Sequence, residues 1–275
     1  MKTTHPLTWI VDGAMCNMMN FVQWRRRTDA CSKDKLAAYI SACSPLSREE
    51  FFGMQPALRP SLRSELIEWD TPRPSGHLEN DRARVRFYPA RNHGAPTVFL
   101  LHALMSASDV GYRRLAERFN TAGWSVAFPH LPYHYSRTPA RTWNGELAIT
   151  ADLVRNAEGL RQAVIELRQL MALLRTQGTK EFALIGTSYG GWIGALLAML
   201  EEDFRDRILP FDRSAARAYA AIAAERRAAG RPISQFDCQI AAIARARAAS
   251  VATRNTDDYD GCGIEVIDPW GTGGS

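Results

Sequence analysis

Apolar, β-rich segments alternate with helical segments through the middle of the chain, and this alternation constrains its fold most strongly. Continuous apolar runs cover 96–103, 124–132 and 180–188, and such runs are typical of strands buried in a parallel sheet. Between them, 109–122 has helical spacing with one apolar face, and 145–177 is a long amphipathic helix or a broken pair of helices. The pattern predicts an α/β fold, a parallel sheet with flanking helices.

The chain before this core has a different character. Residues 1–80 mix aromatic residues with scattered prolines, and we expect short helices and irregular structure there. The segment 83–89 alternates apolar and polar residues, as an edge strand does. The core of the sheet is therefore placed at 81–205.

The composition changes again at 206–275, which is rich in alanine and arginine at its start. Residues 213–229 and 235–249 predict two helices. Short apolar runs at 250–253 and 264–267 predict two strands. This part is expected to form a separate, smaller α/β segment.

Composition also narrows the functional classes. The net charge of +5 and the sequence pI near 9.1 are compatible with an acidic partner such as RNA, although the preference for arginine over lysine fits a GC-rich coding sequence equally well. Five cysteines without CxxC or Cys/His ligand spacing disfavour a disulfide scaffold and structural zinc and predict a cytoplasmic protein. No run of about 18 apolar residues occurs, so we expect no membrane span.

A serine stands where the third apolar strand meets the next helix. Gly186-Thr187-Ser188-Tyr189-Gly190 matches G-x-S-x-G in the strand–turn–helix context that the motif requires. Glycines two before and two after the serine let strand and helix approach closely. The tight turn lifts the hydroxyl off the sheet, and the helix N-terminus points at a developing oxyanion. The alternative is a glycine-rich turn with an incidental serine.

A second feature lies at the end of the strand 96–103. His102, Ala103 and Leu104 lead into a loop of small residues before the next helix. With both features in place, residues of about 80–205 resemble the N-terminal half of the α/β-hydrolase superfamily, which includes esterases and lipases. His-Ala-Leu stands where many members have His-Gly, and His102 is expected to be a structural histidine at the strand end.

The resemblance implies roles for several residues. Ser188 is the implied nucleophile, and Gly186 and Gly190 form its elbow. The backbone N–H groups of Leu104 and Tyr189 are the implied oxyanion hole. The implied substrate is a small ester or other acyl compound, and this part of the chain requires no cofactor.

The predicted serine site lacks its usual base. In this superfamily the acid and the histidine follow the nucleophile in the chain, but none of the histidines follows Ser188. Without a base, a serine hydroxyl is a poor nucleophile at neutral pH. His130 and His134 come after the strand 124–132, and either serve as a replacement base or only shape the pocket.

The tail carries a different set of motifs. They are a G-R-P-I turn, an aspartate that begins an I-A-A-I-A helix, T-R-N followed by D-Y, and a strand ending in Pro-Trp. With these motifs, residues of about 206–270 resemble the C-terminal half of PIN-domain ribonucleases, the VapC and FitB type of toxin. The resemblance implies that Asp237 and Asp258 bind Mg²⁺ or Mn²⁺, with Thr253 and Asn255 beside the second acid. It also implies RNA or an antitoxin protein as a partner.

The metal site stays open to another interpretation. A PIN domain supplies further acids from an opening D-T-N strand and a later glutamate, and no such strand opens this segment; Asp12 is a faint match in a different context. Two carboxylates are too few to hold a metal without substrate phosphates. The alternative roles are a helix N-cap for Asp237 and an Asx turn for Asp258.

Two partial patterns therefore meet near residues 205 and 206, which indicates a recombined, frameshifted or mis-joined reading frame. The first functional hypothesis is a serine hydrolase with weak or no turnover, because neither catalytic set is complete. The alternatives are a PIN-type, Mg²⁺-dependent ribonuclease toxin of a toxin–antitoxin system and a non-catalytic fusion product. A sheet that stops after its nucleophile strand also leaves an apolar edge, which tends to pair with other chains or aggregate.

Overall fold

The computed structural model describes residues 30–53, 61–63, 65–201 and 208–268, together with four isolated positions before residue 30. These residues belong to two compact units, one spanning Cys16–Arg205 and one containing Asp206–Ser275. Expectations that fall on other residues, including Asp12, lie outside the described part. No helix among the described residues is long and apolar enough to cross a membrane.

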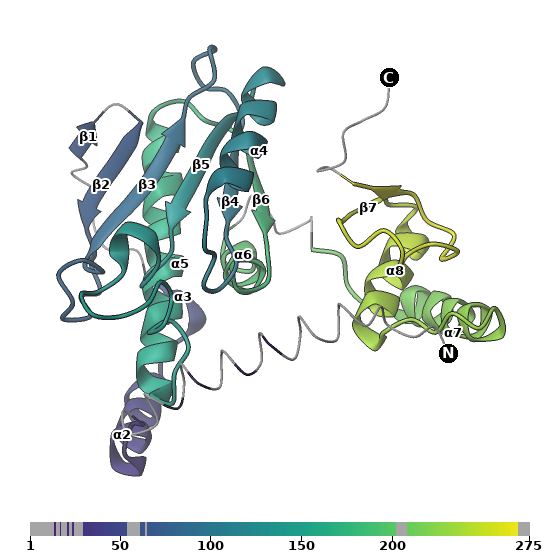
Figure 1. The fold of residues 1–275 in the computed structure, drawn as a ribbon, viewed down its shortest axis with the longest axis horizontal. Coiled ribbons are helices and arrows are strands. Elements are labelled where there is room, and N and C mark those ends of the chain that lie inside the picture. Colours follow the sequence, from purple (N-terminus) through teal and green to yellow (C-terminus); the bar gives the residue numbers. More distant parts are fainter. Residues whose placement is uncertain are drawn as a thin grey trace. The chain divides into compact units, whose positions relative to one another are not determined.

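The first unit contains a six-stranded sheet in the order β1-β2-β3-β5-β4-β6 (Figure 1). Its strands β4, β5 and β6 pair in parallel, whereas β1, β2 and β3 join the sheet through antiparallel pairs. The fold is thus mixed α/β rather than wholly parallel. The strands are β1 (Ser61–Arg63), β2 (Leu66–Asp70), β3 (Arg82–Tyr88), β4 (Thr97–Leu101), β5 (Ser125–His130) and β6 (Phe182–Gly186).

Helices cover both faces of this sheet. On one face, α5 and α6 pack on a core that includes Phe99, Leu101 and Ala127. On the other, α4 packs on Val98 and Leu100. The alternation along β4 explains its continuous apolar sequence, because every residue of that strand is buried. The helices of the unit are α2 (Lys33–Cys43), α3 (Arg48–Phe51), α4 (Val110–Thr121), the 3₁₀ turn η2 (Tyr135–Arg137), α5 (Leu153–Thr176) and α6 (Tyr189–Ala198).

Two expectations for this unit need correction, and the third, a long helix within 145–177, is confirmed in its unbroken form. The strand at 83–89 is not an edge strand, because β3 lies between β2 and β5. Its alternation arises because Ala83 and Val85 face the core, while Arg84 and Arg86 pair with acidic side chains. Residues 1–80 include two strands besides helices, and 145–177 contains one helix that begins only at Leu153.

The second unit pairs two helices with a small sheet. The helices α7 (Arg213–Ala228) and α8 (Gln235–Arg247) pack against each other, and β7 (Val251–Ala252) pairs in parallel with β8 (Val266–Ile267). Alanines at the helix contact allow a close approach. Its buried core consists of Ile222, Cys238, Ala241, Ala242, Tyr259 and Cys262.

Candidate functional site

The turn between β6 and α6 holds Ser188 in a strained backbone conformation. Its φ is 50° and its ψ is −112°, a combination that a residue with a side chain rarely adopts. A Cβ atom at Gly186 would lie 2.6 Å from the backbone nitrogen of Gly191, and one at Gly190 would lie 2.6 Å from the carbonyl oxygen of His102. Glycine is therefore required at both positions for the turn to form.

Backbone hydrogen bonds fix this turn to the neighbouring strand. The Thr187 N–H donates to the Leu101 carbonyl of β4 at 3.0 Å, and the Gly190 N–H donates to the Thr187 carbonyl at 2.9 Å. Ser188 itself is exposed, since β6 is the last strand in the order of the described sheet. The serine thus stands at the carboxyl edge of the parallel strands, where open α/β sheets bind ligands.

The loop after β4 is held by a buried histidine. The Met105 N–H donates to Nε2 of His134 at 3.1 Å, and Nδ1 of the same ring donates to the Pro132 carbonyl at 2.8 Å. The His134 ring stacks on the Tyr189 ring with centroids 5.8 Å apart. Burial lowers the pKa of His134 to about 4, against a raising effect of its bond to Pro132. Both ring nitrogens are therefore engaged in holding backbone groups.

The other two histidines at this edge are engaged as well. Nε2 of His102 accepts the Leu131 N–H at 3.1 Å and Nδ1 donates to the Ala103 carbonyl at 2.9 Å, which is the structural role predicted for it. Nδ1 of His130 bonds the Ser136 hydroxyl at 2.7 Å. Burial is the main cause that lowers the pKa of both rings, that of His130 to about 4. Within the described part, no hydrogen bond joins a histidine to Ser188.

Residues that the sequence did not single out complete this arrangement. The Asn144 amide donates to the Ser106 carbonyl at 2.7 Å and accepts the Tyr135 N–H at 2.6 Å, and the Tyr135 hydroxyl donates to the Ser106 hydroxyl at 2.9 Å. Gly145 has a φ of 77°, and a Cβ there would lie 2.5 Å from Nε2 of His134. The only sequence signal was the Asn-Gly pair, which indicates a turn but not the contact it makes.

A buried ion pair anchors the same segment to α5. Arg137 is 1% exposed and makes a bidentate pair with Glu166 at 2.6 and 2.9 Å. Its guanidinium also donates to the carbonyls of Asn80 and His130. Because all these groups are withdrawn from water, the pair fixes the position of the loop that carries His134.

Tyr189 is buried, whereas its neighbour Ser188 is exposed. Its hydroxyl makes no hydrogen bond to the described residues, and burial raises the pKa of this phenol. Leu104 is half-buried. The proposed use of the Leu104 and Tyr189 N–H groups by a substrate stays a prediction.

In the tail, the two predicted metal-binding acids both act on one tyrosine, Tyr259. Asp237 accepts hydrogen bonds from the Ser234 hydroxyl at 2.6 Å and from the Tyr259 hydroxyl at 3.1 Å. Asp258 accepts one from the Asn255 amide at 2.5 Å. Burial is the first cause that raises the pKa of Tyr259, and the charges of both aspartates add to it. Tyr259 therefore senses both carboxylates.

The alternative role of Asp237 as a helix N-cap is wrong, because Ser234 caps α8 and Asp237 stands in its first turn. The described residues contain no group of three or more His, Cys, Asp or Glu side chains that could hold a metal ion. Two carboxylates alone are too few for Mg²⁺, which prefers six oxygen ligands, so a metal held by Asp237 and Asp258 would need further oxygens from other groups. The predicted metal binding stays untested by this geometry.

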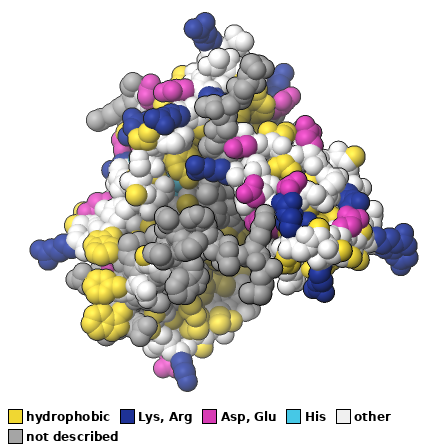
Figure 2. All heavy atoms as spheres, turned by 45° about the vertical axis from the view of Figure 1, so that its right-hand side comes forward, with side chains coloured by type: hydrophobic (Ala, Val, Ile, Leu, Met, Phe, Trp, Pro, Cys, Tyr) yellow, Lys and Arg dark blue, Asp and Glu magenta, His cyan; other side chains and the backbone are white. Residues whose placement is uncertain are grey.

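Three arginines in the described part of the tail pair with acids, the first being Arg231 with Asp260 at 2.5 Å. Arg247 pairs with Asp212 at 2.6 Å and Arg245 pairs with Glu225 at 3.0 Å. On the face drawn in Figure 2, basic and acidic side chains of the described residues lie interspersed. These pairs offset part of the positive charge of the tail.

Curated proteins similar to the chain match it over about a quarter of its length. A plasmid stability protein, StbB, of Pseudomonas syringae is 45% identical over 67 residues, which are 24% of this chain and 48% of that protein. The VapC ribonuclease Y4jK of Sinorhizobium fredii is 42% identical over 64 residues, 23% of this chain and 46% of its own. The chain thus spans about half the length of the curated relatives it matches. No family model matches the chain.

Solved structures similar to the chain are of both kinds. An esterase from an Arctic intertidal metagenomic library overlaps 55% of this chain and 63% of its own, with 14% identity and a TM-score of 0.38. The structure of FitAB bound to a DNA fragment covers 41% of this chain and 72% of its own, with 30% identity and a TM-score of 0.27. The resemblance to PIN-type toxins of the VapC and FitB kind is confirmed over about 24% of the chain, and α/β-hydrolases and esterases are among its structural neighbours.

Proposed function

We propose that the first unit is a serine-hydrolase-like module in which Ser188 attacks a small ester or other acyl group, with weak or no turnover. The observation that carries this proposal is the backbone of Ser188, whose φ of 50° is tolerated between two glycines that have no room for a side chain. Strain of this kind costs about 1–3 kcal/mol and is found mainly at functional sites.

The oxyanion hole would be built from two backbone N–H groups. Tyr189 is the first residue of α6, and the first N–H groups of a helix have no partner within it. In the loop after β4, His134 already occupies the Met105 N–H, so the neighbouring N–H of Leu104 is the one left for substrate. An acyl oxygen between these groups would gain charge stabilisation as it becomes an oxyanion.

Weak turnover follows from the state of the histidines. His134 would have to release the Met105 N–H, and His130 the Ser136 hydroxyl, before either could accept a proton. In serine hydrolases, loss of the base lowers kcat by about 10⁴–10⁶-fold and leaves a residual rate from the oxyanion hole. We therefore expect slow acylation that still depends on Ser188.

The test compares the wild-type chain with Ser188→Ala and with Ser44→Ala, an exposed serine in an ordinary helix cap. Labelling by a fluorophosphonate probe and hydrolysis of an activated ester are measured on all three. We expect slow labelling that Ser188→Ala abolishes and Ser44→Ala leaves unchanged. Equal rates in all three proteins would remove Ser188 as nucleophile.

A cysteine at the same position tests the turn without requiring a base. A thiol at a helix N-terminus has a lowered pKa and reacts faster. Iodoacetamide should therefore alkylate Ser188→Cys several-fold faster than Ser44→Cys, with peptide mapping to separate the native cysteines. Equal alkylation rates would show that the helix N-terminus does not act on position 188.

A PIN-type ribonuclease toxin is the second candidate function, favoured by the 45% identity of 67 residues of the chain to a plasmid stability protein. In that case the tail would bind an antitoxin, and Asp237 and Asp258 would contribute to a site for Mg²⁺ or Mn²⁺ completed by other groups. RNA cleavage in Mg²⁺ that Asp237→Asn abolishes would establish it. Without cleavage, the tail would be the non-catalytic part of a fusion product, and sequencing a transcript across codons 205 and 206 tests that fusion.

A further inference from the structure

A polar pocket of about 300 Å³ lies at the carboxyl edge of the sheet, away from Ser188. Its walls come from α2, from the loop after β2, from the segment after β5 and from the start of α5. The strand β2 runs in the same direction as β5, since two antiparallel pairs separate them. The pocket and Ser188 therefore share one edge of the sheet. The end of β2, which borders the pocket, and the end of β6, which precedes Ser188, are four strand spacings apart, or roughly 19 Å.

The pocket carries more positive than negative charge. Lys35, Arg73 and Arg155 line it together with two carboxylates, Asp152 and Glu158. A further cation, outside the lining, also pairs with Glu158 at 3.2 Å. The lining of the pocket therefore has a net charge of at least +1.

Both carboxylates have their oxygens occupied. Oε2 of Glu158 accepts two hydrogen bonds from Arg73, and Oε1 accepts one from the Tyr39 hydroxyl at 2.8 Å. Oδ1 of Asp152 accepts the N–H groups that begin α5, and Oδ2 accepts Lys35 at 3.0 Å. Burial raises the pKa of each acid, but these donors and the nearby cations lower it by more. The net effect is a lowered pKa, so both acids stay ionised.

The cations, in contrast, keep donors to spare. Lys35 uses one of its three N–H groups in the described part. Arg155 makes one long hydrogen bond to Thr150 at 3.5 Å and lies 3.7 Å from Asp152, which leaves most of its five donors unused within the described residues. Buried Tyr133 and Gln162 form the floor.

We infer that this pocket binds a small organic anion through carboxylate or phosphate oxygens, held by Lys35 and Arg155. The volume corresponds to about ten water molecules, which suits an anion of similar size. The site does not depend on the reactivity of Ser188, so it extends the proposed function rather than resting on it.

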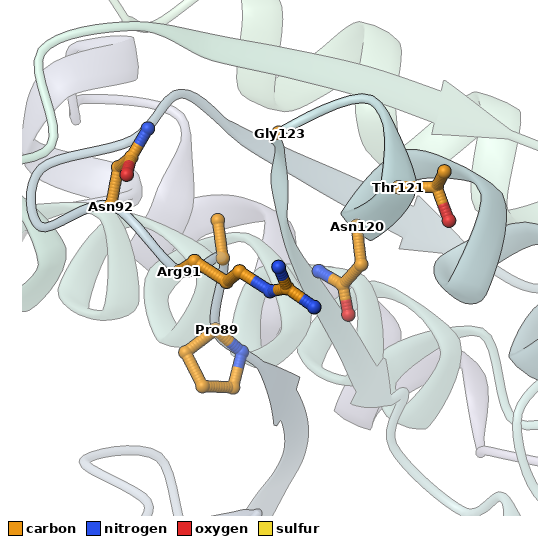
Figure 3. Close-up of a pocket in the computed structure, with 7 residues that line it drawn as sticks. Pro89, Arg91, Asn92, Asn120, Thr121 and Gly123 are labelled. Atoms are coloured by element: carbon orange, nitrogen blue, oxygen red, sulfur yellow. The ribbon is translucent and has the colours of Figure 1, made fainter.

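A second hollow of the same protein provides a matched control. It has about 530 Å³ and lies at the opposite, amino edge, where Arg91 extends towards Asn120 (Figure 3). This hollow borders Thr121, the last residue of α4, and the carbonyl end of a helix disfavours anions. An arginine thus lines each hollow, but only the first hollow is expected to bind an anion.

Isothermal titration calorimetry with inorganic phosphate and with succinate, at constant ionic strength, tests the inference. Binding of at least one of them to the wild-type chain is expected. Because a hydrogen bond to a charged group contributes about 1.5–3 kcal/mol, Arg155→Gln should weaken binding about tenfold or more. Arg91→Gln should leave it unchanged.

Lys35→Gln provides an independent variant, since the Lys35 side chain is 53% exposed and Asp152 keeps the two backbone N–H groups that begin α5, so folding should be little affected. It should weaken binding in the same direction as Arg155→Gln. Absence of heat with both probes in the folded wild-type chain would overturn the inference. So would equal affinities of the wild type, Lys35→Gln and Arg155→Gln.

Discussion

Gly145 provides the sharpest test of how the loop after β4 is held. Its φ of 77° is costly for any residue with a Cβ, and that Cβ would lie 2.5 Å from Nε2 of His134 and 3.0 Å from the Met105 nitrogen. Gly145→Ala should therefore carry two penalties, backbone strain and a collision with the hydrogen bond between those two groups.

Gly123→Ala separates the two penalties. Gly123 has a φ of 85°, and nothing lies within 4 Å of the Cβ that alanine would add. Its cost is the backbone term alone, about 1 kcal/mol after the entropy gain in the unfolded chain. Gly145→Ala should add about 1 kcal/mol for the lost hydrogen bond and about 1–3 kcal/mol for overpacking, a total of about 3–5 kcal/mol.

The assay is urea unfolding followed by tryptophan fluorescence, for which buried Trp69 reports on the first unit. The account predicts that Gly145→Ala lowers the free energy of unfolding by at least about 2 kcal/mol more than Gly123→Ala, the sum of its two extra terms. Equal losses in the two variants would refute the packing of Gly145 on His134, because backbone strain would then explain both.

Three further predictions concern the same unit. Arg137→Leu should lower the free energy of unfolding by about 3–5 kcal/mol, because it leaves the buried carboxylate of Glu166 unpaired. Arg82→Leu breaks the more exposed pair with Asp70 and should lower it by at most about 1 kcal/mol in the same assay. Tyr189→Phe should keep or slightly raise the unfolding free energy, since it removes a buried hydroxyl without a partner among the described residues; a loss above about 1 kcal/mol would reveal a partner. The pKa values of His130 and His134 are lowered to about 4 in the folded state, whereas in the unfolded chain they have the ordinary value of about 6.5. Below about pH 6.5 the unfolded chain therefore binds more protons than the folded chain does. Stability should fall as the pH drops from about 6.5 to 4, and His130→Asn should flatten the urea midpoint over that window; an unchanged slope would contradict the burial of the neutral ring.

The sequence predicted the central strands well because their burial on both faces leaves an unambiguous pattern. The run 96–103 contains β4, and 180–188 contains β6. The sequence-based prediction failed for β3, which is an interior strand. Its arginines alternate with apolar residues because they pair with acids, and this pattern resembles that of a solvent-exposed edge strand. The strands before residue 80 were missed because prolines and charges obscure them.

The elbow glycines could be predicted because the requirement for them is local. The partners of the histidines could not be predicted, because they depend on contacts between segments far apart in the chain. From its place after a strand, His134 could serve as a replacement base or only shape the pocket, and neither interpretation includes the Met105 N–H that it accepts from a different loop. The polar anchor Arg137–Glu166 likewise joins residues 29 positions apart, and no periodic pattern indicates it.

The pH dependence of labelling at Ser188 tests the central claim most directly: the serine stands on a formed elbow but has no base. The fluorophosphonate labelling rate of the wild-type chain is measured from pH 6 to 10, with Ser188→Ala as background. The account predicts a Ser188-dependent rate that keeps rising with hydroxide concentration, without a plateau near neutral pH. A rate that levels off above a pKa of about 6–8 would contradict it, because a titrating base would then be activating the serine.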